Sequence, residues 1–295
     1  MEHQEQQIWT ADEPTGAAAW QAETTDGWTR VVDDRKQRGI DCAPTTRSIW
    51  APPTMRTELV ASDSRFPEGL HHVEAPPGCI RLLGDPALLT RPALAIVGAR
   101  KASPYGLEAA GHFARCAVLR GITIVSGGAI GCDQAAHRGA LDAGGRTIVV
   151  LGCGADIIYP MRARGLFERV LAEGGTIISE APWGSSPSKW GFRRRNRLIA
   201  GLAQATLIVE AGLPSGTFIT ADATLAQGKD VLAIPGSIFA LESRGANRLI
   251  AQGAVPIVDD AGFEDALTMI FGQSEQPKEP SDQESEGGAR DSREG

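Results

Sequence analysis

The segment at residues 126–133 has the composition of a loop that binds an anion. It reads Ser-Gly-Gly-Ala-Ile-Gly-Cys-Asp, beginning at Ser126, and its glycines Gly127, Gly128 and Gly131 let the chain turn sharply and bring bare backbone N–H groups against a ligand. A helical pattern starts near Gln134, so the positive end of a helix dipole would point at the same place. We interpret the segment as a candidate phosphate-binding turn. A single glycine-rich loop could equally be a tight turn that binds nothing.

A second segment, residues 190–197, interleaves aromatic and guanidinium side chains just ahead of a predicted helix. This mixture of side chains suits single-stranded nucleic acid, because arginine binds phosphates and flat rings stack on unpaired bases. As an alternative, the arginines could pair with Glu180 and Glu210, but they outnumber those two carboxylates, which favours binding. The candidate DNA-binding residues of this segment are Phe192, Arg194, Arg195, Asn196 and Arg197.

Two further turns follow other predicted strands, and each could be purely structural. The first offers two cations and a ring for stacking, and the second has the composition of an anion-type helix start. The candidate contacts in these turns are Arg100, Lys101, Tyr105, Ser215, Gly216 and Thr217.

A catalytic constellation is not indicated. His137 lies in a helical pattern without a nucleophile motif or a second histidine at ligand spacing, and Glu180 and Glu210 are the only carboxylates placed where a hydrolase would need them. The 5 cysteines are widely spaced without a C-x-x-C pair, so neither a disulfide framework nor a zinc site is predicted. We therefore expect no catalytic residue, no metal and no cofactor.

The elements that position these loops alternate along the chain. Short apolar, β-branched runs predict strands at 94–97, 122–125, 147–151, 176–178, 206–209, 231–234 and 255–258. Helical spacing occupies 107–119, 134–143, 165–172, 196–203, 218–226 and 246–251. This order predicts an α/β protein with an extended Rossmann-like, doubly wound, mostly parallel sheet and helices on both faces. Ligands of such sheets bind beyond the carboxyl ends of the strands, where all the loops above lie.

Composition divides the chain into a largely disordered, low-complexity region at 1–60, a Rossmann-like DNA-binding domain at 61–272 and a disordered acidic tail at 273–295. The formal charge of −7 comes from the ends, each of which carries −4, so the middle is nearly neutral and locally basic around its arginines. Neither a signal peptide nor an apolar run near the ~18 residues of a membrane span is present, so we expect a cytoplasmic, soluble protein.

Many blocks in order, from about residue 66 to 258, resemble the DNA-processing protein A family (DprA, also called Smf). The blocks are 97–100 with 105–106, 126–133 with 136–140, 150–154 with 159–160, 179–180, 192–202, 209–211 with 215–221, 235–236 and 245–250. The resemblance implies a non-catalytic Rossmann-type homodimer that binds incoming single-stranded DNA in natural transformation and loads the RecA recombinase onto it. It also implies that Arg100, the 126–131 backbone, Arg194, Arg195 and Asn196 grip the DNA backbone, with Phe192 near a base.

The chain departs from the usual family pattern at several positions. Gly128, Ile130 and Cys132 stand where Leu, Arg and Ile are usual, so the loop lacks one basic contact, and a Gly128→Leu substitution is expected to be tolerated. Asp222 stands where the family often has Arg. In the two polar ends we expect no counterpart of the helical domain often found before the Rossmann unit or of the winged-helix domain often found after it.

Two other functions remain open from the residues. The first is a nucleotide-binding enzyme similar to the phosphoribohydrolases, which share glycine-rich phosphate loops, although their Pro-Gly-Gly-x-Gly-Thr type loop is replaced here by the sequence of residues 210–217. The second is a nucleotide-sensing protein with no role on DNA.

Overall fold

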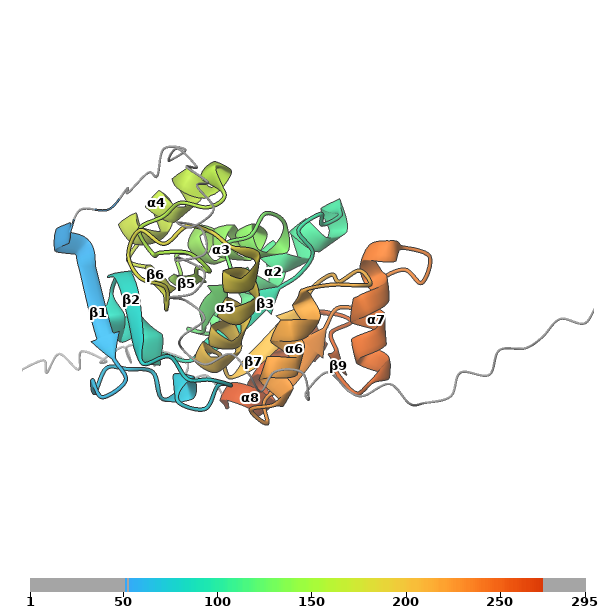
Figure 1. The fold of residues 1–295 in the computed structure, drawn as a ribbon. Coiled ribbons are helices and arrows are strands. Elements are labelled where there is room, and N and C mark those ends of the chain that lie inside the picture. Colours follow the sequence, from blue (N-terminus) through green and yellow to red (C-terminus); the bar gives the residue numbers. More distant parts are fainter. Residues whose placement is uncertain (1–50, 52, 273–295) are drawn as a thin grey trace, which may run out of the picture. The chain divides into compact units, whose positions relative to one another are not determined.

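The computed structural model describes residue 51 and residues 53–272, and these form a nine-stranded sheet between two layers of helices (Figure 1). The expectations for 1–50 and 273–295 lie outside the described residues. The strands are β1 Arg56–Val60, β2 Cys79–Gly84, β3 Ala93–Val97, β4 Thr123–Ser126, β5 Thr147–Val150, β6 Thr176–Ser179, β7 Ala205–Ile208, β8 Asp230–Ala233 and β9 Val255–Pro256. The helices are α2 Pro104–Leu119, α3 Cys132–Asp142, α4 Arg164–Ala172, α5 Lys189–Leu202, α6 Thr217–Leu225, α7 Arg244–Ala251 and α8 Asp260–Phe271.

The sheet has the order β1-β2-β6-β5-β4-β3-β7-β8-β9. All neighbours from β6 to β9 are parallel, while β2 runs antiparallel to both β1 and β6. The predicted α/β class with a mostly parallel, doubly wound sheet is therefore confirmed. Because the central strands are parallel, their carboxyl ends share one edge, and the candidate loops after β3, β4, β5, β6 and β7 meet there.

Alternate residues of each central strand face different helix layers. In β3, Ala95 and Val97 pack with α5, α6 and α7, whereas Leu94 and Ile96 pack with α2, α3 and α8. Helix α4 covers the second face further along the sheet, where Phe167 contacts the β5 and β6 side chains. Strands buried on both faces explain why their sequences are continuous apolar runs.

Two parts of the fold lie outside the predicted elements. Strand β1 falls inside the range assigned to the N-terminal region, and its Leu59 is fully buried, so the sheet begins before residue 61. Helix α8 follows the last predicted strand and buries Phe263 and Leu267. In the described part of the chain, no helix has the length and apolar character needed to cross a membrane.

Candidate nucleic-acid interface

Helix α5 begins earlier than the sequence predicted. The Ser188 hydroxyl caps it by accepting the Gly191 N–H at 2.9 Å, and Gly191 lies against the Gly152 backbone so closely that a Cβ there would collide with it. The arginine-rich segment therefore forms the first turns of a helix and not a loop ahead of it. A helix sends successive side chains to different sides, so its arginines divide between solvent and interior.

Aromatic rings and guanidinium groups meet at the start of α5. The Arg100 guanidinium lies 5.7 Å from the centroid of the Phe192 ring, and that ring lies 5.2 Å from the ring of Tyr159 at an angle of 30°. Trp190 and Arg194 lie one turn apart on α5, and the Arg194 guanidinium lies 5.0 Å from the Trp190 ring. Tyr159 is 45% exposed and Trp190 39% exposed. We call these two groups at the start of α5, five residues in all, the aromatic–arginine face, and in each group a flat ring lies beside a cation, as an unpaired nucleotide requires.

Arg194 and Arg197 share the carboxylate of Glu180. Arg194 Nε donates to Oε1 at 2.9 Å, and Arg197 Nη2 donates to Oε2 at 2.7 Å. Arg197 also donates to the carbonyl oxygens of Glu74 and Ala75, and burial lowers its pKa while Glu180 raises it. The pairing that the sequence left open as an alternative thus occurs. Arg197 is buried and fastens the 74–75 loop, so the expected DNA contact by Arg197 does not fit its position.

Arg195 is also buried, at 5% exposed. Its Nη1 donates to the Gly127 carbonyl at 2.6 Å and to the Val150 carbonyl, so the guanidinium supports the carboxyl ends of β4 and β5. Burial lowers its pKa to about 10, which still leaves it charged at neutral pH, and Asp133 favours that charge. The expected direct contact between Arg195 and DNA phosphate does not fit this burial.

The glycine loop turns its amides inward. Gly127 N–H and Ala129 N–H both point at Asp133 Oδ2, at 3.2 and 3.4 Å, and the Ser126 hydroxyl donates to the Ile96 carbonyl at 2.6 Å. Burial raises the pKa of Asp133, against the effect of Arg195 and of the amides. The carboxylate therefore takes the place that a phosphate was expected to occupy, and the phosphate-binding interpretation of these amides is corrected. Asp133 therefore orients these two amides.

Gly128 and Gly131 are glycines for steric reasons. Both have positive φ, at 67° and 97°, and a Cβ at Gly131 would collide with the Ala99 carbonyl. A Cβ at Gly128 would lie 2.9 Å from both Phe167 Cζ and Val149 Cγ1. The expectation that leucine is tolerated at position 128 is therefore corrected. Ile130, at the tip of the same loop, is 46% exposed.

The candidate residues in the loop after β3 differ in exposure and direction. Arg100 and Lys101 are exposed, whereas Ser103 caps α2 and donates its hydroxyl to Glu210 Oε1 at 2.5 Å. Tyr105 is half exposed, but its hydroxyl donates to the Pro235 carbonyl at 3.0 Å, beyond the end of β8. Tyr105 thus leans toward β8, and Phe192 and Tyr159 supply the rings of the aromatic–arginine face.

The turn before α6 is joined to α5. Asn196 Nδ2 donates to the Gly216 carbonyl at 3.2 Å, and the Ser215 hydroxyl accepts the Thr217 N–H at 3.2 Å. Gly216 is exposed and Thr217 is buried. Asn196 and residues 215–217 therefore form one structural unit at the edge of the helix layer.

The groups considered for catalysis have internal partners. Glu180 binds the two arginines, and Glu210, 3% exposed, accepts both the hydroxyl and the N–H of Ser103. His137 is fully buried, and its Nδ1 lies 2.7 Å from the Thr147 hydroxyl. His137 is therefore a packed residue of α3.

Tyr159 and Trp190 are absent from the candidate residues chosen from the sequence. Tyr159 follows β5 in a long loop, and nothing in its spacing shows that its ring reaches α5. Trp190 stands in the aromatic-rich segment itself, so its place beside arginines was the available signal.

A family model described as "DNA recombination-mediator protein A" matches residues 57–267. Among curated proteins, the chain is 40% identical over 202 residues to Protein Smf of Escherichia coli, covering 68% of this chain and 54% of that protein. It is 36% identical over 197 residues to DNA processing protein DprA of Bacillus subtilis, covering 66% of each chain. The chain spans about half the length of the first of these relatives.

Two solved structures share the fold. DNA processing protein A from Streptococcus pneumoniae superposes with a TM-score of 0.67 at 34% identity, covering 71% of this chain and 73% of that one. DNA processing protein A from Helicobacter pylori gives a TM-score of 0.66 at 31% identity, covering 72% of this chain and 96% of that one. The Helicobacter pylori structure is described as showing a single-stranded DNA binding mode.

Proposed function

Because the chain belongs to the DNA recombination-mediator protein A family, we propose that it binds single-stranded DNA on the aromatic–arginine face and catalyses no reaction. The observation that carries this proposal is the position of the Arg100 guanidinium over the Phe192 ring, with Tyr159 on the same ring. A base can stack on such a ring only when it is unpaired, and the neighbouring cation attracts its phosphate.

The proposal divides the candidate residues by exposure. Arg100 and Lys101 are exposed and would neutralise phosphates, while Phe192, Tyr159 and Trp190 would receive bases. Arg194, whose guanidinium is paired with Glu180, would hold the Trp190 ring in place. Buried arginines do not reach the DNA phosphates and so release no counterions. They would instead hold the interface in the conformation that binds DNA. The other candidate residues would support the interface by holding its loops and helices in place. They are Ser126, Gly127, Gly128, Gly131, Arg195, Asn196, Arg197, Ser215, Gly216 and Thr217, together with Tyr105, whose hydroxyl binds the Pro235 carbonyl.

Equilibrium titration separates this function from a nucleotide enzyme or sensor. Labelled single-stranded and duplex oligonucleotides of one sequence, together with nucleoside monophosphates, are titrated at moderate salt. We expect clear preference for the single strand over duplex, weak monophosphate binding and no release of free base. Tight monophosphate binding or base release would favour the phosphoribohydrolase-like alternative, and equal affinity for single strand and duplex would contradict the stacking mode.

The recombinase partner is proposed from the family resemblance. We propose that the chain loads RecA onto DNA in transformation or recombination. The test is a strand-exchange reaction in which a single-strand binding protein blocks RecA, and addition of the chain should restore exchange. No stimulation at saturating chain would contradict the loading role.

We also propose that the chain acts as a homodimer. The segment between β8 and α7 presents apolar side chains to solvent, with Ile238 74%, Phe239 88% and Leu241 61% exposed. Covering such a patch by a second copy would remove apolar surface from water. Sedimentation should give a dimer that Phe239→Glu dissociates, and a monomer at all concentrations would contradict the proposal.

A further inference from the structure

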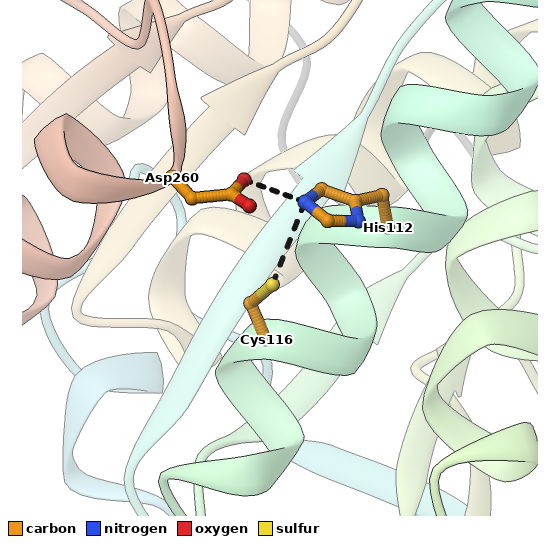
Figure 2. Close-up of side chains that lie close together, drawn as sticks. All are labelled: His112, Cys116 and Asp260. Atoms are coloured by element: carbon orange, nitrogen blue, oxygen red, sulfur yellow. Dashed lines mark hydrogen bonds and ion pairs between the residues drawn. The ribbon is translucent and has the colours of Figure 1, made fainter.

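Three side chains with metal-binding atoms converge on the sheet face opposite α5 (Figure 2). His112 and Cys116 lie one turn apart on α2, and Asp260 begins α8. His112 Nε2 is 2.6 Å from Asp260 Oδ1 and 3.7 Å from Cys116 Sγ, and the ligand atoms all lie within 4.8 Å of one another.

The hydrogen bonds among these three side chains leave the thiol proton of Cys116 without an acceptor within the group. A neutral imidazole carries one proton, and the close approach of Asp260 Oδ1 places that proton on His112 Nε2, because a carboxylate only accepts. The Cys116 thiol then faces a nitrogen that has no free lone pair to accept its proton. A cation at the centre would engage all three groups, because imidazole, thiolate and carboxylate can each donate an electron pair.

The separations agree with a tetrahedral ion. Zinc binds sulfur at about 2.3 Å and nitrogen at about 2.0–2.1 Å, which places the two ligand atoms about 3.6 Å apart in a tetrahedral site. The observed 3.7 Å between Sγ and Nε2 fits this value. The carboxylate must retreat from His112, and Asp260, with its side chain 67% exposed, has room to do so.

The two helices are held together around the group. Phe113 of α2 packs on Phe263 of α8 with ring centroids 4.7 Å apart, and Arg120 Nη1 donates to Glu264 Oε2 at 2.9 Å. The two helices therefore start from a nearly fixed arrangement, and ion binding requires only a side-chain shift of Asp260.

We propose that His112, Cys116 and Asp260 bind one zinc ion that fastens α8 to α2, with the fourth coordination position open to water. Asp260 supplies the negative charge of the site itself, since Glu264 is paired with Arg120. The sequence analysis predicted no metal site because Asp260 is remote in the sequence from the His-x-x-x-Cys pair on α2.

The test is a titration of the full chain with Co²⁺ under reducing conditions. A thiolate ligand gives a near-ultraviolet charge-transfer band, and tetrahedral geometry gives intense visible bands. We expect saturation at one equivalent and displacement of the bands by Zn²⁺. Cys116→Ser should abolish the charge-transfer band, and His112→Gln or Asp260→Asn should weaken binding by at least about 10-fold, the loss that even an outer-sphere partner causes.

The matched controls are Cys79→Ser, which removes another half-buried thiol, and His72→Gln, which removes an exposed imidazole. Both should keep the bands, and Zn²⁺ should raise the Tm of wild type and of both controls but not of Cys116→Ser. The absence of a charge-transfer band in wild type, or its persistence in Cys116→Ser, would overturn the proposal.

Discussion

Arg195 Nη1 donates to the Gly127 carbonyl at 2.6 Å, so a buried cation lies beneath the glycine loop. The same guanidinium is electrostatically coupled to Asp133, whose carboxylate accepts the Gly127 N–H. Loop, carboxylate and arginine therefore stabilise one another. The loop therefore supports the proposed interface, and exposed residues such as Arg100 would make the phosphate contacts.

Salt dependence distinguishes the buried arginine from the exposed one. Arg100→Ala should make the log–log salt dependence of single-strand binding shallower by about 0.7, the value for one phosphate contact. Arg195→Met should leave the slope unchanged while lowering the free energy of unfolding, because the Gly127 and Val150 carbonyls lose their donor, at about 1–3 kcal/mol for each unsatisfied group. A shallower slope for Arg195→Met would show that this residue contacts phosphate after all.

Loss of the central ring should weaken binding without changing charge. Phe192→Ala should cost about 1–3 kcal/mol of single-strand affinity, the value of one stacked base, with the salt slope retained. The control is Leu119→Ala, which removes an exposed apolar side chain at the end of α2 and should leave the affinity unchanged. Equal losses in the two variants, compared at one oligomeric state, would argue against a specific role for Phe192.

The steric role of Gly128 can be separated from its backbone conformation. Gly128 and Gly144 have φ of 67° and 73°, but only Gly128 has neighbours where a Cβ would lie. Gly144→Ala should cost about 1 kcal/mol of unfolding free energy through φ alone. Gly128→Ala should cost about 1–3 kcal/mol more, because the methyl group meets Phe167 and Val149. Equal costs in denaturant unfolding would mean that those side chains move aside freely.

His137 makes stability depend on pH. The Thr147 hydroxyl donates to the Ile124 carbonyl, so it accepts from His137 Nδ1, and the buried Nε2 has no hydrogen-bond partner. Burial, with Arg195 and Arg138, lowers the pKa of His137 to about 3. His137 therefore stays neutral in the folded state at a pH where the unfolded state is already protonated, near 6.5. Protonation of the unfolded state costs no stability above pH 6.5, and the free energy of unfolding falls as the pH drops from 6.5 toward 3.

The measurement is denaturant unfolding between pH 7 and pH 4. This group should contribute a fall of up to about 1.4 kcal/mol per pH unit. His137→Asn should remove that part of the slope, whereas His72→Asn, at an exposed position, should retain it. An unchanged slope in His137→Asn would contradict the assignment.

The sequence predicted the sheet better than the interface. Each central strand is a continuous apolar run because both faces are buried, so the runs located β3 to β8 to within a residue or so. Helix α8 was not predicted, although Asp259 at its N-cap and the helical spacing of Phe263, Leu267 and Ile270 were an available signal.

The spacing of the arginines did not show which of them are buried. Arg195 and Arg197 are buried because carbonyl oxygens from distant segments, at Gly127, Val150, Glu74 and Ala75, converge on them. Polarity patterns describe a side chain and its neighbours in sequence, and they do not reveal carbonyl acceptors brought together by the fold. For the same reason the sequence did not predict the contact of Tyr159 with Phe192, which forms only in the folded chain.

Photo-crosslinking tests the central claim most directly. A single-stranded oligonucleotide containing 5-iododeoxyuridine is bound to the full chain, irradiated and digested, and the crosslinked peptides are identified by mass spectrometry. The proposed interface predicts crosslinks at Tyr159, Trp190 or Phe192, suppressed by excess unlabelled single strand and not by duplex. Crosslinks confined to other surfaces, such as Phe239 or α8, would contradict it.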